Sequence, residues 1–148
     1  MKSAASTSHD PFNLGRFLDA QAGTFERALS ELASGTKRSH WIWFIFPQLK
    51  GLGSSAMAHR YTLGSLDEAR AYLSHELLGA RLEQCTTLVI KSHALSLREL
   101  FGSPDDLKFC SSMTLFAHAS HADSLYHAAL NRWCDGIEDP LTMSALNR

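Results

Sequence analysis

Basic and polar side chains flank one strongly aromatic stretch, and they are the residues with the clearest potential for chemistry. Lys37 and His40 precede the run WIWFIF, and Gln48 follows it directly after Pro47. If the run is helical, Lys37 and His40 lie at its N-terminal end, where free N–H groups and the helix dipole favour an anion. His40 is the best candidate for a general acid or base, because imidazoles titrate near neutral pH. The alternative is a solvated basic turn in which His40 only satisfies backbone groups.

A second group of polar side chains is spaced by about one helical turn. Lys108, Ser111 and Ser112 share one helix face, and the apolar residues Phe109 and Met113 lie on the opposite face. A lysine beside a serine can activate the hydroxyl as a nucleophile, but such residues on a helix more often face water. We therefore expect these three side chains to contact a ligand rather than to catalyse a reaction.

The remaining motifs predict no cofactor and no metal. The segment 51–55, GLGSS, lacks the glycine and lysine spacing of phosphate-binding and dinucleotide-binding loops, so we interpret it as a turn before a helix over residues 55–61. His118 and His121 are three residues apart, and the chain contains neither an HExxH motif nor a cysteine pair at zinc spacing.

Composition limits the classes of function. The chain has 148 residues, 45% hydrophobic and 20% charged, with a formal net charge of −1. This length predicts one domain, which we place at residues 10–135 between a disordered tail at 1–9 and a C-terminal tail at 136–148. The near-neutral charge disfavours nucleic acid as a partner, and no apolar stretch is long enough for a membrane span. The sequence does not indicate whether the protein binds a protein partner.

The cysteines indicate the redox compartment. Cys85, Cys110 and Cys134 are widely spaced and odd in number. This pattern argues against a disulfide framework and favours reduced thiols in a cytoplasmic protein. Cys85 and Cys110 fall on apolar stripes, so we expect both to be core residues.

Apolar residues recur at helical spacing along most of the chain. Asp10 and Pro11 are a typical N-cap and first helical residue, and Gly35 is a typical helix end. The spacing predicts helices over residues 14–21, 25–35, 66–73, 78–91, 105–116 and 123–133.

The WIWFIF run is the exception, because its aromatic and β-branched residues favour a strand. A lone strand would have no partner among helices, so we predict a short buried helix from about Ser39 to Phe46, capped by Ser39. The predicted fold is therefore all-α: a compact single-domain multi-helix bundle with this aromatic helix at its centre.

Four segments of the chain resemble one known family. The segments DPFNLGRFLDAQ, KRSHWIWFIFPQLKGLG, EARAYLSHELLGARL and DDLKFCSSMTLF are similar to the bacterial family catalogued as domain of unknown function 1810, from about Asp10 to about Trp133. The resemblance implies a compact all-helical fold and a set of motif positions, but no reaction. These positions are Lys37, Ser39, His40, Trp41, Trp43, Phe46, Pro47, Gln48, Gly51, Gly53, Lys108, Ser111, Ser112 and Thr114.

Together these patterns predict a pocket near the SHWIWFIFPQ segment that binds a small polar or anionic ligand of the nucleotide or sugar-phosphate type. Aromatic walls with a few convergent polar groups are typical of such pockets. The alternative is a helical protein-interaction module without catalytic activity. The sequence specifies neither a ligand nor a reaction. The candidate contacts are Lys37, His40, Trp43, Gln48, Lys108, Ser111 and Ser112.

Overall fold

A computed structural model describes residues 10–53 and 55–147. In these ranges the chain forms ten helices and no strand, which confirms the all-α prediction; the nearest approach to a sheet is one isolated bridge between Leu49 and Leu63. The helices are α2 (Gly15–Gln21), α3 (Phe25–Ser34), α4 (Ile42–Ile45), α5 (Ala56–Arg60), α6 (Leu66–Ser74), α7 (Glu76–Ile90), α8 (Leu97–Phe101), α9 (Asp105–Ala119), α10 (Leu125–Trp133) and α11 (Pro140–Leu146).

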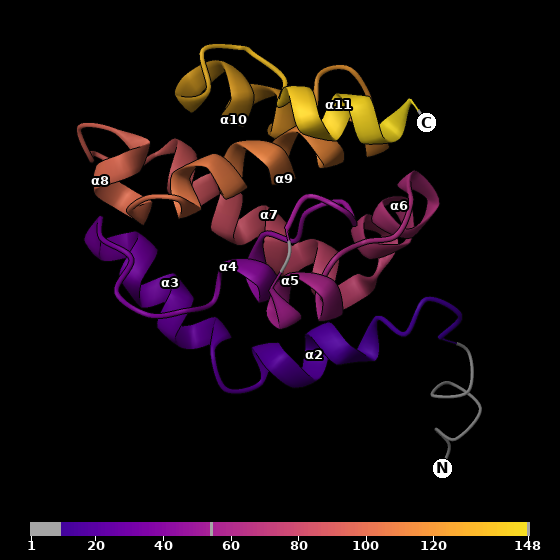
Figure 1. The fold of residues 1–148 in the computed structure, drawn as a ribbon. Helices are drawn as coiled ribbons and strands as arrows, with labels where there is room; N and C mark the ends of the chain where they lie inside the picture. Colours follow the sequence, from indigo (N-terminus) through magenta and orange to yellow (C-terminus); the bar gives the residue numbers. More distant parts are fainter. Residues whose placement is uncertain (1–9, 54, 148) are drawn as a thin grey trace.

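The helices are stacked in tiers around the two longest ones (Figure 1). Helices α2 and α3 form one outer side, and α10 and α11 form the other. Between them, α9 packs against α6, α8, α10 and α11, while α7 packs against α3, α6 and α10. None of the helices in the described ranges has the length and apolar character needed to cross a membrane.

Local capping explains where several helices begin and end. The hydroxyl of Ser55 accepts a hydrogen bond from the N–H of Ala58, and that of Ser65 accepts one from Glu68, so both serines satisfy free donors of a first turn. Gly35 follows α3 with a φ of 85°, a left-handed conformation that suits glycine. These short-range features are why the helix ends lie near their predicted positions.

The aromatic run forms a helix that is shorter than predicted. Only Ile42–Ile45 are helical, and Trp41 occupies the N-cap position without a side-chain cap. Ser39 does not cap the helix, because its hydroxyl donates instead to the carboxylate of Glu31 at 2.7 Å. The prediction of a helix was right, but its limits of Ser39 and Phe46 and its cap were wrong.

The side chains of this run pack at the centre of the core. Trp41 and Phe46 are fully buried. The Phe46 ring lies edge-on to Phe109, with 5.0 Å between centroids, and Phe101 stacks on Phe109 at 5.1 Å. Phe46 directly follows α4, whereas Phe101 and Phe109 belong to the consecutive helices α8 and α9, so aromatic contacts join the aromatic run to two helices much later in the sequence.

Both ends of the described chain differ from the predictions. The carboxylate of Asp10 caps the N–H groups of Leu14 and Gly15, so the first described helix begins at Gly15 rather than at Pro11. The segment predicted as a tail at 136–148 contains α11, where Thr142 is fully buried. The tail predicted at 1–9 lies outside the described residues.

The prediction of reduced thiols was wrong for two of the three cysteines. Cys110 and Cys134 form a disulfide that joins α9 to the end of α10, with 6.1 Å between their Cα atoms. The two residues are 24 positions apart, and only the packing of α9 against α10 brings them together. Cys85 is free and buried as predicted, and burial raises the pKa of its thiol to about 12.

Candidate functional site

Two of the sequence-predicted residues come together around one carboxylate. The ammonium of Lys37 lies 2.7 Å from Oδ2 of Asp105, and that of Lys108 lies 3.6 Å from Oδ1 of the same residue. The Lys37 side chain is only 5% exposed. Asp105 was not among the predicted site residues, because its position in the sequence indicated only a favourable charge in the first turn of a helix.

Two indole rings complete this cluster. The Lys37 ammonium lies 5.1 Å from the ring centroid of Trp41, and the Lys108 ammonium lies 4.9 Å from that of Trp43. Cations are attracted to the faces of such rings. The structure therefore brings Lys37, Trp43 and Lys108 together. The two lysine ammonium groups, however, already interact with the carboxylate of Asp105 and with the two indole rings.

His40 and Gln48 do not join this cluster through any described interaction. His40 is exposed, and no hydrogen bond to its ring occurs in the described ranges. Gln48 is half-buried, and its backbone carbonyl accepts a hydrogen bond from Leu63 N–H at 2.9 Å. The backbone of Gln48 thus contributes a hydrogen bond at the isolated bridge between Leu49 and Leu63, next to the aromatic run.

The two candidate serines of α9 are both buried, but their hydroxyls differ. The Ser111 hydroxyl donates to the carbonyl of Leu107 at 3.1 Å, one turn earlier in the same helix. The Ser112 hydroxyl is fully buried and has no hydrogen-bond partner among the described residues. Neither hydroxyl is hydrogen-bonded to the ammonium of Lys108 in the part of the chain that the structure describes.

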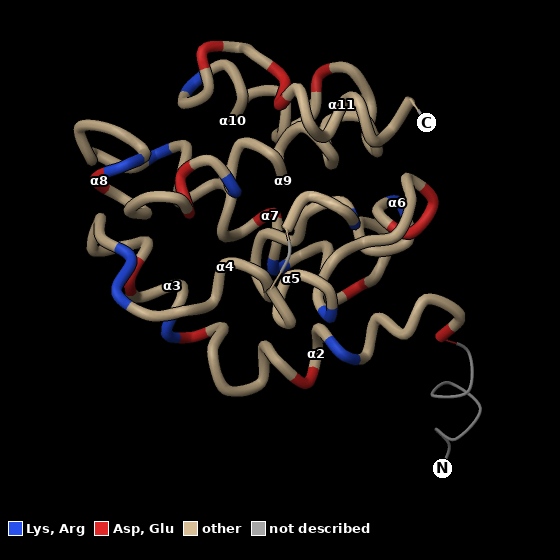
Figure 2. Tube along the Cα trace, in the orientation of Figure 1, with Lys and Arg blue, Asp and Glu red and all other residues tan. Residues whose placement is uncertain are grey.

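A second group of basic residues surrounds a cavity of about 410 Å³ between the starts of α2 and α6 and the end of α5. Figure 2 shows Lys and Arg positions on α2 and α5 close to one another. We call this the cationic cavity; its lining includes Arg16, Lys50, His59, Arg60, Gly64 and Glu68.

Arg16 is the structural clamp of this cavity. Its Nε donates to the carbonyl of Arg60 at 2.8 Å, and Nη1 donates to the carbonyls of Phe12 and Asn13, both at 2.7 Å. Its Nη2 donates to the carbonyl of Thr62 at 2.7 Å. Nη2 also donates to the Glu68 carboxylate at 3.0 Å, so all five donors of this guanidinium are occupied.

The charges that line the cationic cavity do not cancel. One carboxylate oxygen of Glu68 accepts from Arg16 and the other accepts from the N–H of Gly64 at 2.9 Å, so this acid is already paired. Neither Lys50 nor Arg60 forms a salt bridge in the described ranges, and both are exposed. The cavity therefore has an excess of positive charge and free donors.

The sequence pattern did not indicate this cavity as a whole. Arg16 and Lys50 are 34 positions apart, and Arg16 resembled any polar residue on the outside of an amphipathic helix. Among the residues that line the cavity, only Lys50 lies beside predicted motif positions, because it stands between Gln48 and the glycines at 51 and 53.

The fold and the cavity define a small all-helical protein with a cation-lined surface site. The chain belongs to the family described as "Protein of unknown function (DUF1810)", which matches residues 11–146. It is similar to the conserved hypothetical protein Rv1873 from Mycobacterium tuberculosis, whose crystal structure superposes with a TM-score of 0.91. The two sequences are 52% identical, over 94% of this chain and 99% of that one. The search of curated proteins found no match.

Proposed function

We propose that this protein binds a small anionic ligand of the nucleotide or sugar-phosphate type in the cationic cavity. The observation that carries the proposal is the presence of two basic side chains, Lys50 and Arg60, that line one cavity and have no carboxylate partner in the described residues. Hydrogen bonds from ionised donors to phosphate or carboxylate are stronger than those between neutral groups.

The geometry suits a polar ligand of moderate size. A volume of about 410 Å³ lies within the usual range of small-molecule sites. The clamp by Arg16 holds the backbone of Arg60, and the Arg60 guanidinium lies 5.5 Å from the ring centroid of Tyr61. Both contacts restrict Arg60 before a ligand arrives, which lowers the entropic cost of binding.

The cationic cavity is close in sequence to the predicted site, because Lys50 is only two residues after Gln48. The cluster of Lys37, Trp43 and Lys108 remains a second place for an anion. It is weaker support, because Asp105 already pairs with both of its lysines. Variants that remove basic side chains from only one of the two places show which of them binds the anion.

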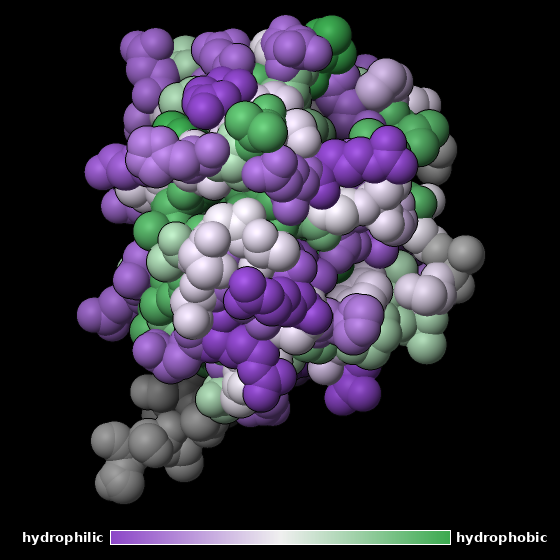
Figure 3. All heavy atoms as spheres, turned by 90° about the vertical axis from the view of Figure 1, so that its left-hand side faces the viewer, coloured by the Kyte–Doolittle hydropathy of each residue, from purple (hydrophilic) through white to green (hydrophobic). Residues whose placement is uncertain are grey.

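The alternative of an interaction module has less support. A docking surface needs a continuous apolar area, but Figure 3 shows a face on which hydrophilic side chains surround smaller apolar spots. The large apolar side chains with high exposure belong to several different segments: Phe12, Leu77, Leu95, Leu107, Ile137 and Leu141.

Titration calorimetry with inorganic pyrophosphate and ribose 5-phosphate tests the proposal. Lys50→Ala and Arg60→Ala should each weaken binding roughly tenfold, since each removes one charged hydrogen-bond donor. The matched controls are Lys91→Ala and Arg98→Ala, which remove exposed basic side chains that do not line this cavity. These two variants should bind like the unmodified protein.

Two results would contradict the proposal. If neither probe binds at millimolar concentration, the cavity is not an anion site. If His40→Ala or Lys108→Ala abolishes binding while Lys50→Ala and Arg60→Ala do not, the anion lies at the sequence-predicted residues instead. Circular dichroism of each variant confirms that the helical fold is intact.

A further inference from the structure

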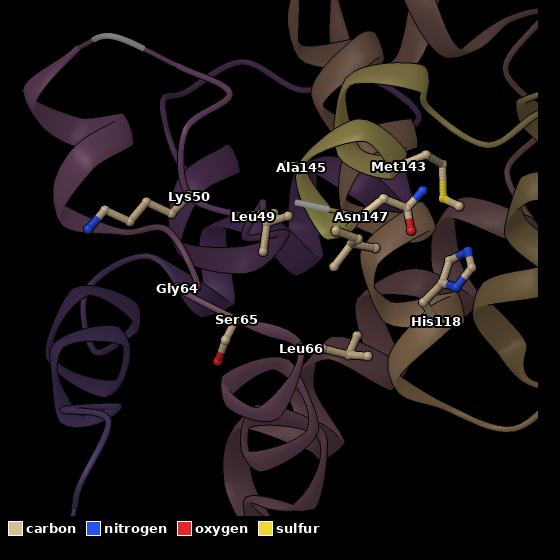
Figure 4. A pocket seen from close by; sticks show the side chains of 10 residues that line it. Leu49, Lys50, Gly64, Ser65, Leu66, His118, Met143, Ala145 and Asn147 are labelled. Atoms are coloured by element: carbon tan, nitrogen blue, oxygen red, sulfur yellow. The ribbon is translucent and has the colours of Figure 1, made fainter.

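A second cavity adjoins the cationic one. It has a volume of about 440 Å³, and Lys50 and Gly64 line both cavities. Its other walls come from Leu49, from the start of α6, from His118 of α9 and from α11 with the residue that follows it, so we call it the C-terminal cavity. Figure 4 shows Lys50 extended away from His118 and α11, so that its ammonium lies on the opposite side from the C-terminal helix.

The C-terminal cavity differs from the cationic one in chemistry. Leu49, Leu66, Met143 and Leu146 supply apolar surface. None of the described residues that line it is an aspartate or glutamate, and Lys50 is its one lysine or arginine. The two cavities together therefore present a charged end and a mainly apolar end that meet at Lys50 and Gly64.

Polar groups at the rim of the C-terminal cavity can form hydrogen bonds with the polar edge of a ligand ring. The Asn147 amide offers both donors and an acceptor. The ring of His118 is paired through Nε2 with the carboxylate of Glu138. Its Nδ1 has no hydrogen-bond partner among the described residues, so this nitrogen is available to a ligand.

We infer that the C-terminal cavity holds the base of a nucleotide whose phosphate lies in the cationic cavity. This inference rests on the proposed function, because it assigns the uncharged part of the same anionic ligand. Apolar walls suit the faces of a base, and an amide and an imidazole nitrogen suit its polar edge. A sugar phosphate alone would leave this apolar surface unfilled.

Calorimetric titrations of the full-length protein with ribose 5-phosphate and with AMP, GMP, CMP and UMP test the inference. The tightest nucleotide should bind at least roughly tenfold more tightly than ribose 5-phosphate, because only the nucleotides bury a base. His118→Ala should reduce that advantage and leave the affinity for ribose 5-phosphate unchanged. Ala145→Phe, which fills the C-terminal cavity, should do the same.

Matched controls keep the test specific. His121→Ala removes an exposed histidine near the same end of α9, and Ala128→Phe adds a ring to the exposed face of α10; neither residue lines the C-terminal cavity. Both should retain the full preference for the nucleotide. The His118–Glu138 pair is exposed, so its loss should change the free energy of unfolding only slightly.

The outcomes separate this inference from the proposal on which it rests. Equal affinity for ribose 5-phosphate and all four nucleotides overturns the inference and leaves the anion site standing. A nucleotide preference that persists in both His118→Ala and Ala145→Phe places the base elsewhere and also overturns it. If no probe binds, both the anion site and the base site are refuted.

Discussion

The carboxylate of Glu31, at the end of α3, accepts a hydrogen bond of 2.8 Å from the indole N–H of Trp41, at the start of the aromatic helix. The same carboxylate accepts hydrogen bonds from the backbone N–H groups of Arg38 and Ser39 and from the Ser39 hydroxyl. One buried acid thus fixes the path of the chain from α3 into α4, and it holds the most buried tryptophan in place.

This arrangement predicts a loss of stability in acid. Burial by itself raises the pKa of Glu31, but hydrogen bonds from Ser39, Arg38 and Trp41 outweigh it and lower the pKa from 4.5 to about 2. The ionised form therefore stabilises the fold above about pH 4.5, and this contribution is lost as the pH falls towards 2. Its size is on the order of 3 kcal/mol. Urea unfolding at a series of pH values measures it.

The variant Glu31→Gln should lower the free energy of unfolding at pH 7 by roughly 2–4 kcal/mol, because an amide has one acceptor oxygen for four donors. Its stability should also change less than that of the unmodified protein between pH 4.5 and 2. Glu26→Gln is the matched control, since Glu26 is exposed on the same helix. Equal acid sensitivity in Glu31→Gln and the unmodified protein would refute the role of Glu31.

Arg16→Lys should destabilise the fold although it preserves the charge. Lysine has three donors on one atom and cannot reach the four carbonyls and the carboxylate that Arg16 binds. We expect a loss of roughly 2–3 kcal/mol in the free energy of unfolding. Arg27→Lys, at an exposed position of α3, should have almost no effect in the same urea titration. Comparable stability of the two variants would show that the clamp contributes little.

The disulfide between Cys110 and Cys134 predicts a thiol count. The unfolded, unreduced protein should expose one reactive thiol, from Cys85, and the reduced protein should expose three. Cys134→Ser should lower the free energy of unfolding by about 3 kcal/mol, because the bond closes a loop of 24 residues. Three reactive thiols before reduction would refute the bond.

Lys37→Met should separate stability from binding. The variant removes the nearly buried partner of Asp105 and should cost roughly 1–3 kcal/mol of unfolding free energy. Its affinity for ribose 5-phosphate should stay unchanged if the ligand lies in the cationic cavity. Lys91→Met, at an exposed position, is the control for stability. A loss of binding in Lys37→Met would favour the anion site at the start of the aromatic helix.

Sequence patterns predicted the helices well where the determinants are local. Ser55 and Gly35 act through residues within a turn of themselves, so the neighbouring helix ends were readable. The short helix α8 and the C-terminal α11 were missed. Leu97–Phe101 is too short to show a helical period, and α11 follows a stretch that appeared to end the fold.

The candidate site was less predictable, because charge pairing depends on residues that are distant in the sequence. Lys37 and Asp105 are 68 positions apart, yet their ion pair decides that Lys37 is not a free cation. The residues next to His40, the histidine of the predicted site, do not indicate whether its ring is exposed or buried.

The sequence by itself determined the all-helical class, the burial of the aromatic run and most helix ends, because periodicity and capping act over three or four residues. Only the tertiary structure decided which charges are neutralised, which two cysteines bond and where the cavities lie. These properties arise when α2, α5, α9 and α10 pack together. Arg16 shows the difference: its helix was readable from its neighbours, but two of its carbonyl partners, those of Arg60 and Thr62, come from 44 and 46 residues away.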